Sequence, residues 1–325
     1  MRRIGLAVVL ALSLCLEPLA AQTQQVKIGV LCAGMCAFGH PQGSQPLIDA
    51  LARVRLVQNR TLVWDIGGIT SSEDQITIEA QKLVSRRPTL ILVWGNVAAA
   101  QAAKDATRTI PIVLLAVPDV VEQGLVDSLG RPGSNITGTS VPTLDLIIKQ
   151  LQVLKEINTR LKTIVVVQGD LNRGDRQTMD HLRGAAASLG LDSGFSVTDA
   201  SNVQRALAAA PAGTSAVVAI GNISQTAHHQ LRESAIERKL PLVMPWSWQL
   251  AGLSGTLLIS YGPRFSALAE RTATLIDRIV KGARPDDLPV EEPTSYELVI
   301  DGVVAKALGL TIPPSVRVRA DEIIE

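Results

Sequence analysis

Two cysteines and a histidine are the residues best placed in this sequence for covalent chemistry. Cys32 and Cys36 are followed by His40, and a thiol nucleophile would need a lowered pKa and a base such as this histidine. A metal site would need a second cysteine pair, or histidines at ligand spacing, and the sequence has neither close by. In an oxidising compartment the two cysteines can instead form a local disulfide, Cys32–Cys36. We predict no metal site.

A glycine-rich stretch, GRPGSNITG at 130–138, raises the question of a phosphate-binding loop. A dinucleotide site needs G-x-G-x-x-G, and the glycines here, Gly130, Gly133 and Gly138, have a different spacing. A P-loop needs Gly-Lys-Ser/Thr, and this stretch contains no lysine. GLSG at 252–255 is one residue short of a nucleophile elbow, and no HExxH occurs. The usual catalytic motifs are therefore missing.

Neighbouring acids do not point to catalysis either. Asp286 with Asp287, and Glu291 with Glu292, lie in proline-rich polar stretches, and we interpret both pairs as solvated surface. Because the sequence shows none of these catalytic patterns, we predict a protein that is not an enzyme and that uses no cofactor.

The composition is that of a globular chain with a large core. Of the 325 residues, 46% are hydrophobic and 19% are charged, and this length favours two domains. The formal net charge is +1 and aromatic residues make up 3%, so neither electrostatics nor base stacking favours nucleic acid as a partner.

The first 21 residues have the three parts of a secretory signal. MRR is a positive start, IGLAVVLALSLCL is an apolar run, and small and then polar residues follow, with cleavage expected after Ala21. Leu14 stands before Cys15, where a lipidation signal has a small residue. No later apolar stretch is long enough to span a membrane. We therefore expect an exported, periplasmic protein.

Strand-like and helix-like segments alternate along the rest of the chain. Helical periodicity is clear in SSEDQITIEAQKLVSRR, NVAAAQAAKDAT and LDLIIKQLQVLKEI. Short apolar runs, typical of strands that are buried on both faces, occupy 26–31, 61–67, 89–94, 110–117, 163–168, 216–221, 240–244 and 256–262. Such alternation predicts βαβ units and parallel sheets.

We expect an α/β fold of two Rossmann-like lobes joined by a hinge. A TIM barrel also alternates, but 118–142 indicates a long crossover and the helices follow the strands at uneven intervals. The first lobe is expected at 26–140, with part of 264–300 returning to it. The second is expected at 141–262, with part of 300–325 packing on it or on the hinge. The end of the chain, 283–325, has a proline-rich and then helical pattern.

The residues just after the predicted strands form a candidate ligand crevice. Ligands of open α/β sheets bind outside the carboxyl ends of the strands, where helix N-termini favour anionic groups. Small, polar or aromatic side chains that can hydrogen-bond or stack stand at these positions. The candidate binding residues are Cys32, Phe38, Gly95, Asn96, Asp119, Thr139, Ser140, Asp170, Asn222, Trp246 and Tyr261.

Five stretches of the chain follow a recognisable family pattern: 102–113, 124–138, ISYGP at 259–263, 277–301 and 305–325. They resemble the family of ABC-transporter substrate-binding proteins from uncharacterised transport systems. The resemblance implies a type I periplasmic-binding-protein fold, with two α/β lobes and several hinge crossings. It also implies a protein that hands a small solute to a membrane permease and its ATPase, and members of the family include binders of tryptophan and other amino acids.

Three departures from the family pattern affect what can be carried over. Val120 replaces a proline after the matching Asp119, and Gly130 and Ser134 are substitutions in the glycine-rich stretch. IDALARVRLVQN stands where the family often has a GLRELGY helix, with a cysteine-containing loop before it. The ligand loop of the first lobe, and with it the identity of the ligand, is therefore the least transferable part.

We therefore expect a monomeric binding protein that closes on a small amino-acid-like ligand. Asn96 with Thr139 or Ser140 would hold a carboxylate, and Asp119 would hold an amine. Trp246 and Tyr261 would stack on the ligand or line its apolar part. GRPGSNITG would turn the chain and start the strand that leads into the first crossing, with Thr139 and Ser140 at the crevice floor. The alternatives are an exported sensory module and a thiol-dependent exported enzyme.

Overall fold

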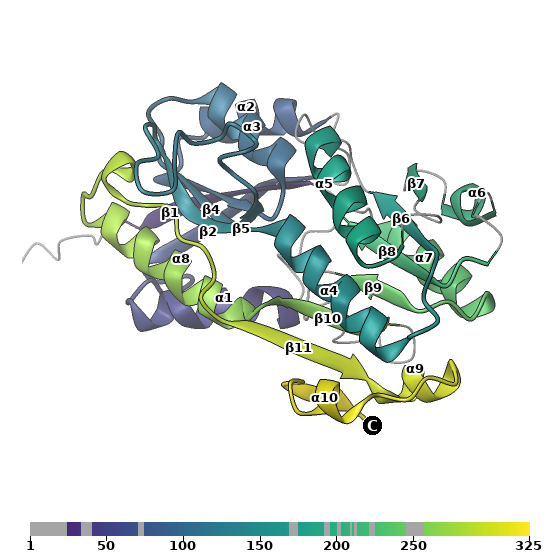
Figure 1. The fold of residues 1–325 in the computed structure, drawn as a ribbon. Coiled ribbons are helices and arrows are strands. Elements are labelled where there is room, and N and C mark those ends of the chain that lie inside the picture. The colour runs from purple at the N-terminus through teal and green to yellow at the C-terminus, as the bar shows by residue number, and fades with distance from the viewer. Residues whose placement is uncertain are drawn as a thin grey trace, which may run out of the picture.

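The computed structural model contains two β-sheets with helices packed on both faces of each (Figure 1). The predicted signal segment, 1–21, lies outside the residues that the structure describes. These are 25–33, 41–70, 75–168, 175–191, 196–199, 203–208, 210, 213–220, 225–244 and 257–325.

The first sheet is parallel throughout the described residues. Its strands are β1 (Val26–Ala33), β2 (Leu62–Thr70), β3 (Leu90–Trp94), β4 (Ile112–Pro118) and β5 (Ile136–Val141). They lie in the order β2-β1-β3-β4-β5. Every residue of the central strand β3 is buried, because helices cover both of its faces.

Two pairs of helices cover this sheet. One face packs on α1 (Pro41–Arg53) and α8 (Phe265–Val280), and the other on α2 (Ile76–Ser85) and α3 (Val97–Ala106). The helix α8 follows the strand β10 (Leu257–Pro263) of the other sheet, yet its apolar face contributes Leu268 and Ile276 to the core of this one. The first half of the chain therefore cannot complete its own core.

The second sheet is mixed. Its strands are β6 (Ile164–Gln168), β7 (Ser196–Asp199), β8 (Ala216–Ile220), β9 (Leu242–Met244), β10 (Leu257–Pro263), β11 (Tyr296–Asp301) and β12 (Glu322–Ile324). They lie in the order β12-β11-β10-β9-β8-β6-β7, and only β10 and β11 are antiparallel among the described pairs.

Helices also cover both faces of the second sheet. One face packs on α4 (Thr143–Ile157), α5 (Asp175–Ser188), α9 (Gly302–Ala307) and α10 (Pro314–Arg317). The other face packs on α6 (Val203–Ala208) and α7 (Gln225–Glu237). Each sheet with its helices forms one α/β lobe.

The chain passes between the two sheets three times within the described residues. It leaves β5 for α4 at 141–143, returns from β10 to α8 at 263–265, and enters β11 through 291–296. The third crossing lies beside the other two, because Ser140 N donates to Glu291 O (2.9 Å) and Arg264 N donates to Ser295 O (3.2 Å). The predicted class, two Rossmann-like lobes joined by a multi-crossing hinge, is confirmed.

The eight apolar runs that were predicted as strands all form strands. The end of the chain differs from the prediction, because 283–325 was expected to be proline-rich and then helical, and it contains the strands β11 and β12 besides two short α-helices. The antiparallel pair has a topological reason. The third crossing enters the second sheet at the edge from which β10 leaves it, so β11 runs the opposite way.

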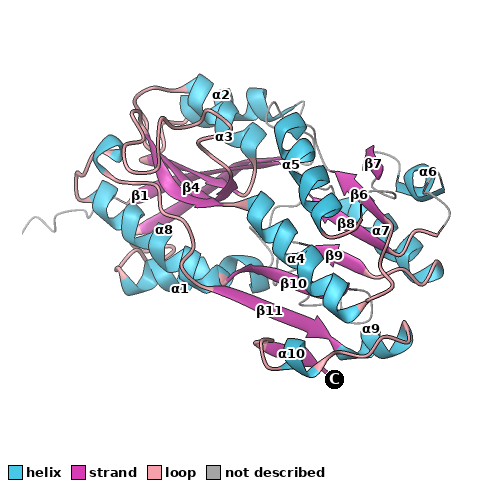
Figure 2. Ribbon diagram, in the orientation of Figure 1, coloured by secondary structure: helices cyan, strands magenta, loops and turns pink. Residues whose placement is uncertain are grey.

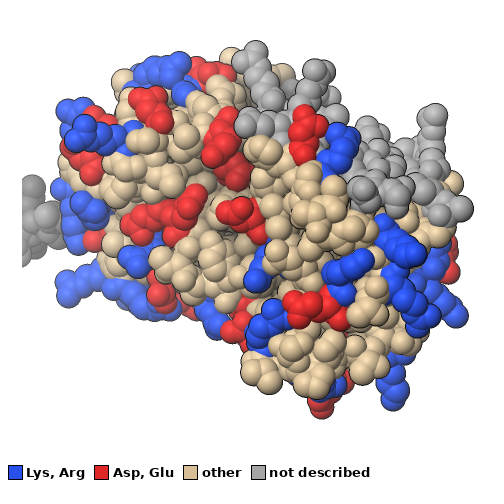
Figure 3. Space-filling view, in the orientation of Figure 1, with Lys and Arg blue, Asp and Glu red and all other residues tan. Residues whose placement is uncertain are grey.

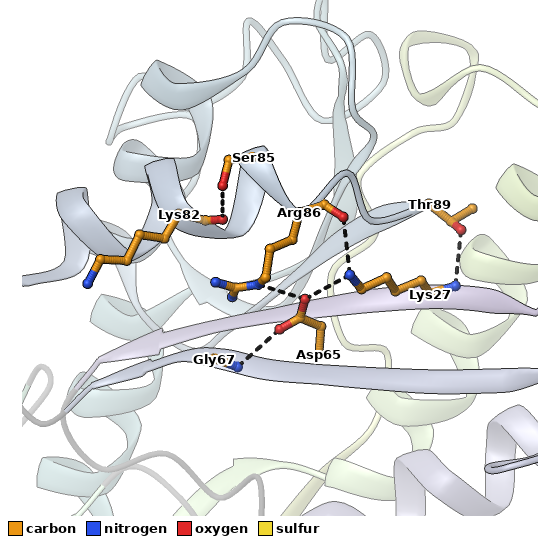
Figure 4. A network of polar contacts seen from close by, with 7 residues as sticks. All are labelled: Lys27, Asp65, Gly67, Lys82, Ser85, Arg86 and Thr89. Atoms are coloured by element: carbon orange, nitrogen blue, oxygen red, sulfur yellow. Dashed lines mark hydrogen bonds and ion pairs between the residues drawn. The ribbon is translucent and has the colours of Figure 1, made fainter.

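A polar network ties the open edge of the first sheet to α2 (Figure 4). The Asp65 carboxylate on β2 accepts from Arg86 Nε (2.8 Å), lies 3.2 Å from Lys27 Nζ, and accepts from Gly67 N (3.3 Å). Burial by itself raises the pKa of Asp65, but the hydrogen bonds from Arg86, Lys27 and Gly67 outweigh this and lower the pKa below its usual value.

Within the described part of the chain, no helix has both the length and the apolar character that a membrane crossing requires.

Candidate functional site

The carboxyl ends of the strands of the first sheet lie at the edge that faces the second sheet. β5 ends there because the chain leaves it for α4, and the other four strands run parallel to β5. Similarly, β10 ends where the chain returns to α8, and β6 to β9 run parallel to it. The two sets of strand ends therefore face each other across the crossings (Figure 2). This is the edge at which α/β sheets bind their ligands.

Gly95 and Asn96 connect β3 to α3 at this edge. Gly95 has a φ of +62°, a conformation that glycine adopts without strain. Asn96 caps α3, since its Oδ1 accepts from Ala99 N (2.6 Å) and its side chain is buried. The positive end of the α3 dipole therefore points to the same edge, where it favours an anionic group.

Asp119 stands at the end of the neighbouring strand, β4. Its φ of +46° belongs to the left-handed region, which aspartate tolerates better than most residues. Its N–H donates to Val141 O (3.1 Å), and its Oδ1 accepts from Thr143 N (3.0 Å) at the start of α4. Asp119 therefore holds the chain on both sides of Pro142, within the first crossing.

The surroundings of Asp119 disfavour its charged form. Burial raises the pKa of Asp119 to about 6, and the carboxylates of Glu122 and Glu292 add to this, while the hydrogen bond from Thr143 opposes it. Glu292, on the third crossing, also has a raised pKa, because of burial and the charges of Glu122 and Asp145. Figure 3 shows acidic side chains gathered on the face where the two lobes meet. Glu292 is exposed, as expected from the sequence, and its charge also acts on Asp119.

Thr139 and Ser140 are fully buried and bonded inside the protein. Thr139 Oγ1 accepts from Ala116 N (2.9 Å) and lies 3.4 Å from Thr272 Oγ1 of α8. Ser140 Oγ accepts from Val120 N (3.4 Å). Both hydroxyls therefore fasten β5 to its neighbours beside the hinge. Their expected role as carboxylate ligands stays a prediction.

Tyr261 lies on β10 at the second crossing and joins the two cores. It packs against apolar residues of both lobes and stacks on Tyr296, with ring centroids 5.8 Å apart. Its carbonyl accepts from Gln150 Nε2 (2.7 Å) of α4. Burial raises the pKa of the Tyr261 hydroxyl, and Asp321 contributes to the shift. These contacts give Tyr261 a part in the hinge that sequence reasoning missed.

Cys32 lies near the carboxyl end of β1 and is buried. It takes part in a disulfide bond, and its Sγ is 3.6 Å from the carbonyl oxygen of Trp94. A disulfide-bonded sulfur has no thiolate to act as a nucleophile, which removes the basis of the thiol-enzyme alternative at Cys32. The expected partner, Cys36, lies outside the described residues, so the pairing stays a prediction.

The remaining site residues expected from the sequence fall on parts of the chain that the structure does not describe, and so does His40. These residues are Phe38, Asp170, Asn222 and Trp246. The described part of the site is therefore Gly95, Asn96 and Asp119, with Thr139, Ser140, Tyr261 and Cys32 packed behind it. Around it, the structure adds Glu122, Asp145, Glu292 and Tyr296. No group of three or more acidic, histidine or cysteine side chains that could hold a metal occurs within the described ranges.

Two facing α/β lobes joined by three crossings define a type I periplasmic binding protein. The family model for ABC transporter substrate binding protein matches residues 41–324, and the chain belongs to this family. It is a solute-binding protein of the ABC transporter class.

Relatives and solved structures agree with this assignment. A tyrosine-binding protein of Clostridioides difficile (strain R20291) is 28% identical over 235 residues, which cover 71% of this chain and 66% of that relative, just under two thirds. An ABC domain from Streptococcus pneumoniae in complex with L-Trp superposes with a TM-score of 0.80 at 22% identity, covering 93% of this chain and all of that one. A ligand-free, open substrate binding protein from Clostridium difficile superposes with a TM-score of 0.61 at 23% identity. The superposition covers 92% of this chain and 99% of that one.

Proposed function

We propose that this chain is the periplasmic solute-binding protein of an ABC importer and that its ligand is a small polar molecule of the amino-acid type. The protein would bind the ligand between its lobes as a monomer and deliver it to a membrane permease with its ATPase. The observation that carries the proposal is the pairing of two opposite chemistries on neighbouring strands. The N-terminus of α3, capped by Asn96, suits a carboxylate, and the Asp119 carboxylate suits an ammonium.

The register of the sheet supports this pairing. β3 and β4 are adjacent and parallel, and Gly95 N donates to Leu115 O (2.9 Å), so Gly95 and Asn96 lie beside the last residues of β4. β4 continues beyond Leu115 to Pro118, and Asp119 follows it. An α-amino acid carries its carboxylate and ammonium on one carbon, so its two charged groups need binding groups on neighbouring strand ends.

Two comparisons support the ligand class and the conformation. The curated relative is a tyrosine-binding protein, and one superposed structure is a complex with L-Trp. At nearly equal identity, the chain superposes better on that complex than on the ligand-free open structure. We therefore propose that the arrangement described above is the closed one, which a ligand with contacts to both lobes would stabilise.

The proposed lobe borders follow the cores. The first lobe would comprise 26–140 with part of 264–300, since α8 packs on the first sheet. The second would comprise 141–262 with part of 300–325, since β12 and the last two helices pack with the second sheet. The segment 296–301, as β11, belongs with the second lobe.

The test is a binding measurement on the protein without its first 21 residues. A thermal-shift screen against the L-amino acids, starting with L-tryptophan and L-tyrosine, should show a ligand that raises the melting temperature by mass action. Calorimetry with that amino acid should then show affinity losses of about tenfold or more for Asn96→Ala and Asp119→Asn, because each variant removes a contact to a charged group.

Asp301→Ala is the matched control for the lost helix cap. Asp301 is also a buried cap, with Oδ1 accepting from Val304 N (2.9 Å), but it stands at the far end of β11. Both cap variants should lose about 1 kcal/mol of stability, and only Asn96→Ala should lose affinity. Unchanged affinity in both Asn96→Ala and Asp119→Asn would refute the site, and consumption of the amino acid on mixing would refute a pure binding role.

A further inference from the structure

The first crossing is held by one residue that belongs to the first lobe. The Asp119 N–H donates to Val141 O (3.1 Å), and its Oδ1 accepts from Thr143 N (3.0 Å). Asp119 is therefore hydrogen-bonded to the residues on both sides of Pro142. Thr143 is the first residue of α4, which packs on the second sheet. A change in the angle between the lobes must therefore act on the environment of the Asp119 carboxylate.

Among the residues that the structure describes, the charges that act on this carboxylate come from acidic side chains on neighbouring segments. Glu122 follows Asp119 on its own loop, and Glu292 lies on the third crossing. Asp145, in the first turn of α4, acts on Glu292. These three side chains are exposed, whereas Asp119 is partly buried. We call Asp119, Glu122, Asp145 and Glu292 the hinge cluster. It brings together both lobes and two of the crossings.

We propose that the hinge cluster makes the balance between the closed arrangement and a more open one depend on pH, with acid favouring closure. This goes beyond the proposed ligand binding, and it rests on the proposed function in one respect, that the arrangement described above is the closed one of a hinge that opens. The cause is repulsion between like charges that the closed arrangement brings together around a partly buried carboxylate.

The direction follows from linkage. In the closed arrangement burial and the neighbouring acids raise the pKa of Asp119 to about 6, and opening would return it toward the ordinary value of about 4 by hydrating and separating the charges. The arrangement with the higher pKa binds the proton more tightly. The closed-to-open ratio should therefore rise by up to about tenfold per pH unit as the pH falls from about 6 to about 4, and should level off above about 6.

Small-angle X-ray scattering of the ligand-free protein tests the proposal. The radius of gyration should fall between about pH 7.5 and about pH 4.5, and the transition should move to lower pH at high salt, because salt screens the exposed members of the cluster. Asp119→Asn keeps the acceptor for Thr143 but removes the charge, so it should be compact throughout this range. Glu292→Gln, at an exposed position that folding tolerates, should move the transition of the wild-type protein to lower pH.

Asp286→Asn is the control, because Asp286 is a partly exposed acid of the same inter-lobe segment that pairs with Arg284. The radius of gyration of this variant should depend on pH as that of the wild-type protein does. A radius of gyration that does not change with pH would overturn the proposal. So would a transition that is the same in Asp119→Asn, Glu292→Gln and the wild-type protein, and that result would assign the transition to another group, such as a histidine. Either result leaves the ligand-binding proposal intact, since no ligand is present.

Discussion

At the scale of single residues, the glycine-rich stretch is a packing device. Gly138 lies on β5 with a φ of +136°, and a Cβ built there would overlap the backbone N and O of Leu114 on β4. Only glycine allows the two strands to pair at this point. The stretch that resembles a phosphate loop in composition therefore sets the approach of β5 to β4, just before the chain crosses to the second lobe.

We expect Gly138→Ala to destabilise the protein by about 3 kcal/mol or more, because both the backbone conformation and the overlap oppose a side chain. Urea denaturation followed by circular dichroism measures the loss. Gly130→Ala in the same stretch is the control, since its φ is not positive and nothing lies within 4 Å of the added Cβ. Equal stability of the two variants would contradict this account.

At the scale of elements, the Asp65 network secures an edge strand. β2 has no partner strand on its outer side among the described strands, and Ile66 is exposed there. Arg86 just beyond α2 and Lys27 on β1 both bond to the one carboxylate on β2, so three elements are fixed by a single group. The side chain of Asp65 is only 11% exposed, which protects these bonds from competition by water.

We expect Asp65→Asn to lower the free energy of unfolding at neutral pH by about 1–3 kcal/mol, through loss of hydrogen bonds between charged groups. The folded-state pKa of Asp65 lies below its usual value, so this contribution is present above the unfolded-state pKa, about 4, and is lost as the pH falls through the folded-state pKa. The difference between wild type and variant should therefore shrink in acid.

Urea titrations at neutral and acidic pH measure this difference. Asp286→Asn again serves as the comparison, because Asp286 has a lowered pKa through its pairing with Arg284 but is more exposed than Asp65, so it should contribute little. A loss for Asp65→Asn that is the same at both pH values would show that packing, rather than the charge, accounts for it.

At the scale of the whole molecule, the crossings make the two lobes depend on each other. The helix α8 starts just after β10 of the second sheet and completes the core of the first sheet. Tyr261 packs against both cores from the second crossing. Opening at the hinge can therefore preserve each core, whereas unfolding of either lobe removes part of the packing of the other.

We expect thermal unfolding of the ligand-free protein to be a single calorimetric transition. Ile276→Ala, in the buried face of α8, should cost about 2–5 kcal/mol and shift the whole transition, since the cavity lies in a core that both halves of the chain build. Val318→Ala, at a position that is 87% exposed, should leave it unchanged. Two separate transitions, only one of which responds to Ile276→Ala, would disprove this coupling.

Local patterns were enough to predict the strands that are buried on both faces. The runs around β3, β4 and β8 are continuously apolar, and the environment of a central parallel strand requires that composition. Asn96 was predicted at the start of α3 for a similarly local reason, because a cap bonds only three residues ahead. The strands β11 and β12 were missed, since they lie in a proline-rich segment and pair only after the third crossing returns the chain to the second sheet.

The amino-acid sequence by itself determined the alternation of strands and helices, and with it the α/β class and the polar positions that follow the strands. These properties depend on residues close together in the chain. Tertiary structure alone decided that α8 packs on the first sheet. It also decided that the hydroxyls of Thr139 and Ser140 form hydrogen bonds inside the protein beside the hinge, and that Asp119 lies near three other acids. Those relations join residues that can be more than half the chain apart, and only the three crossings bring them into contact.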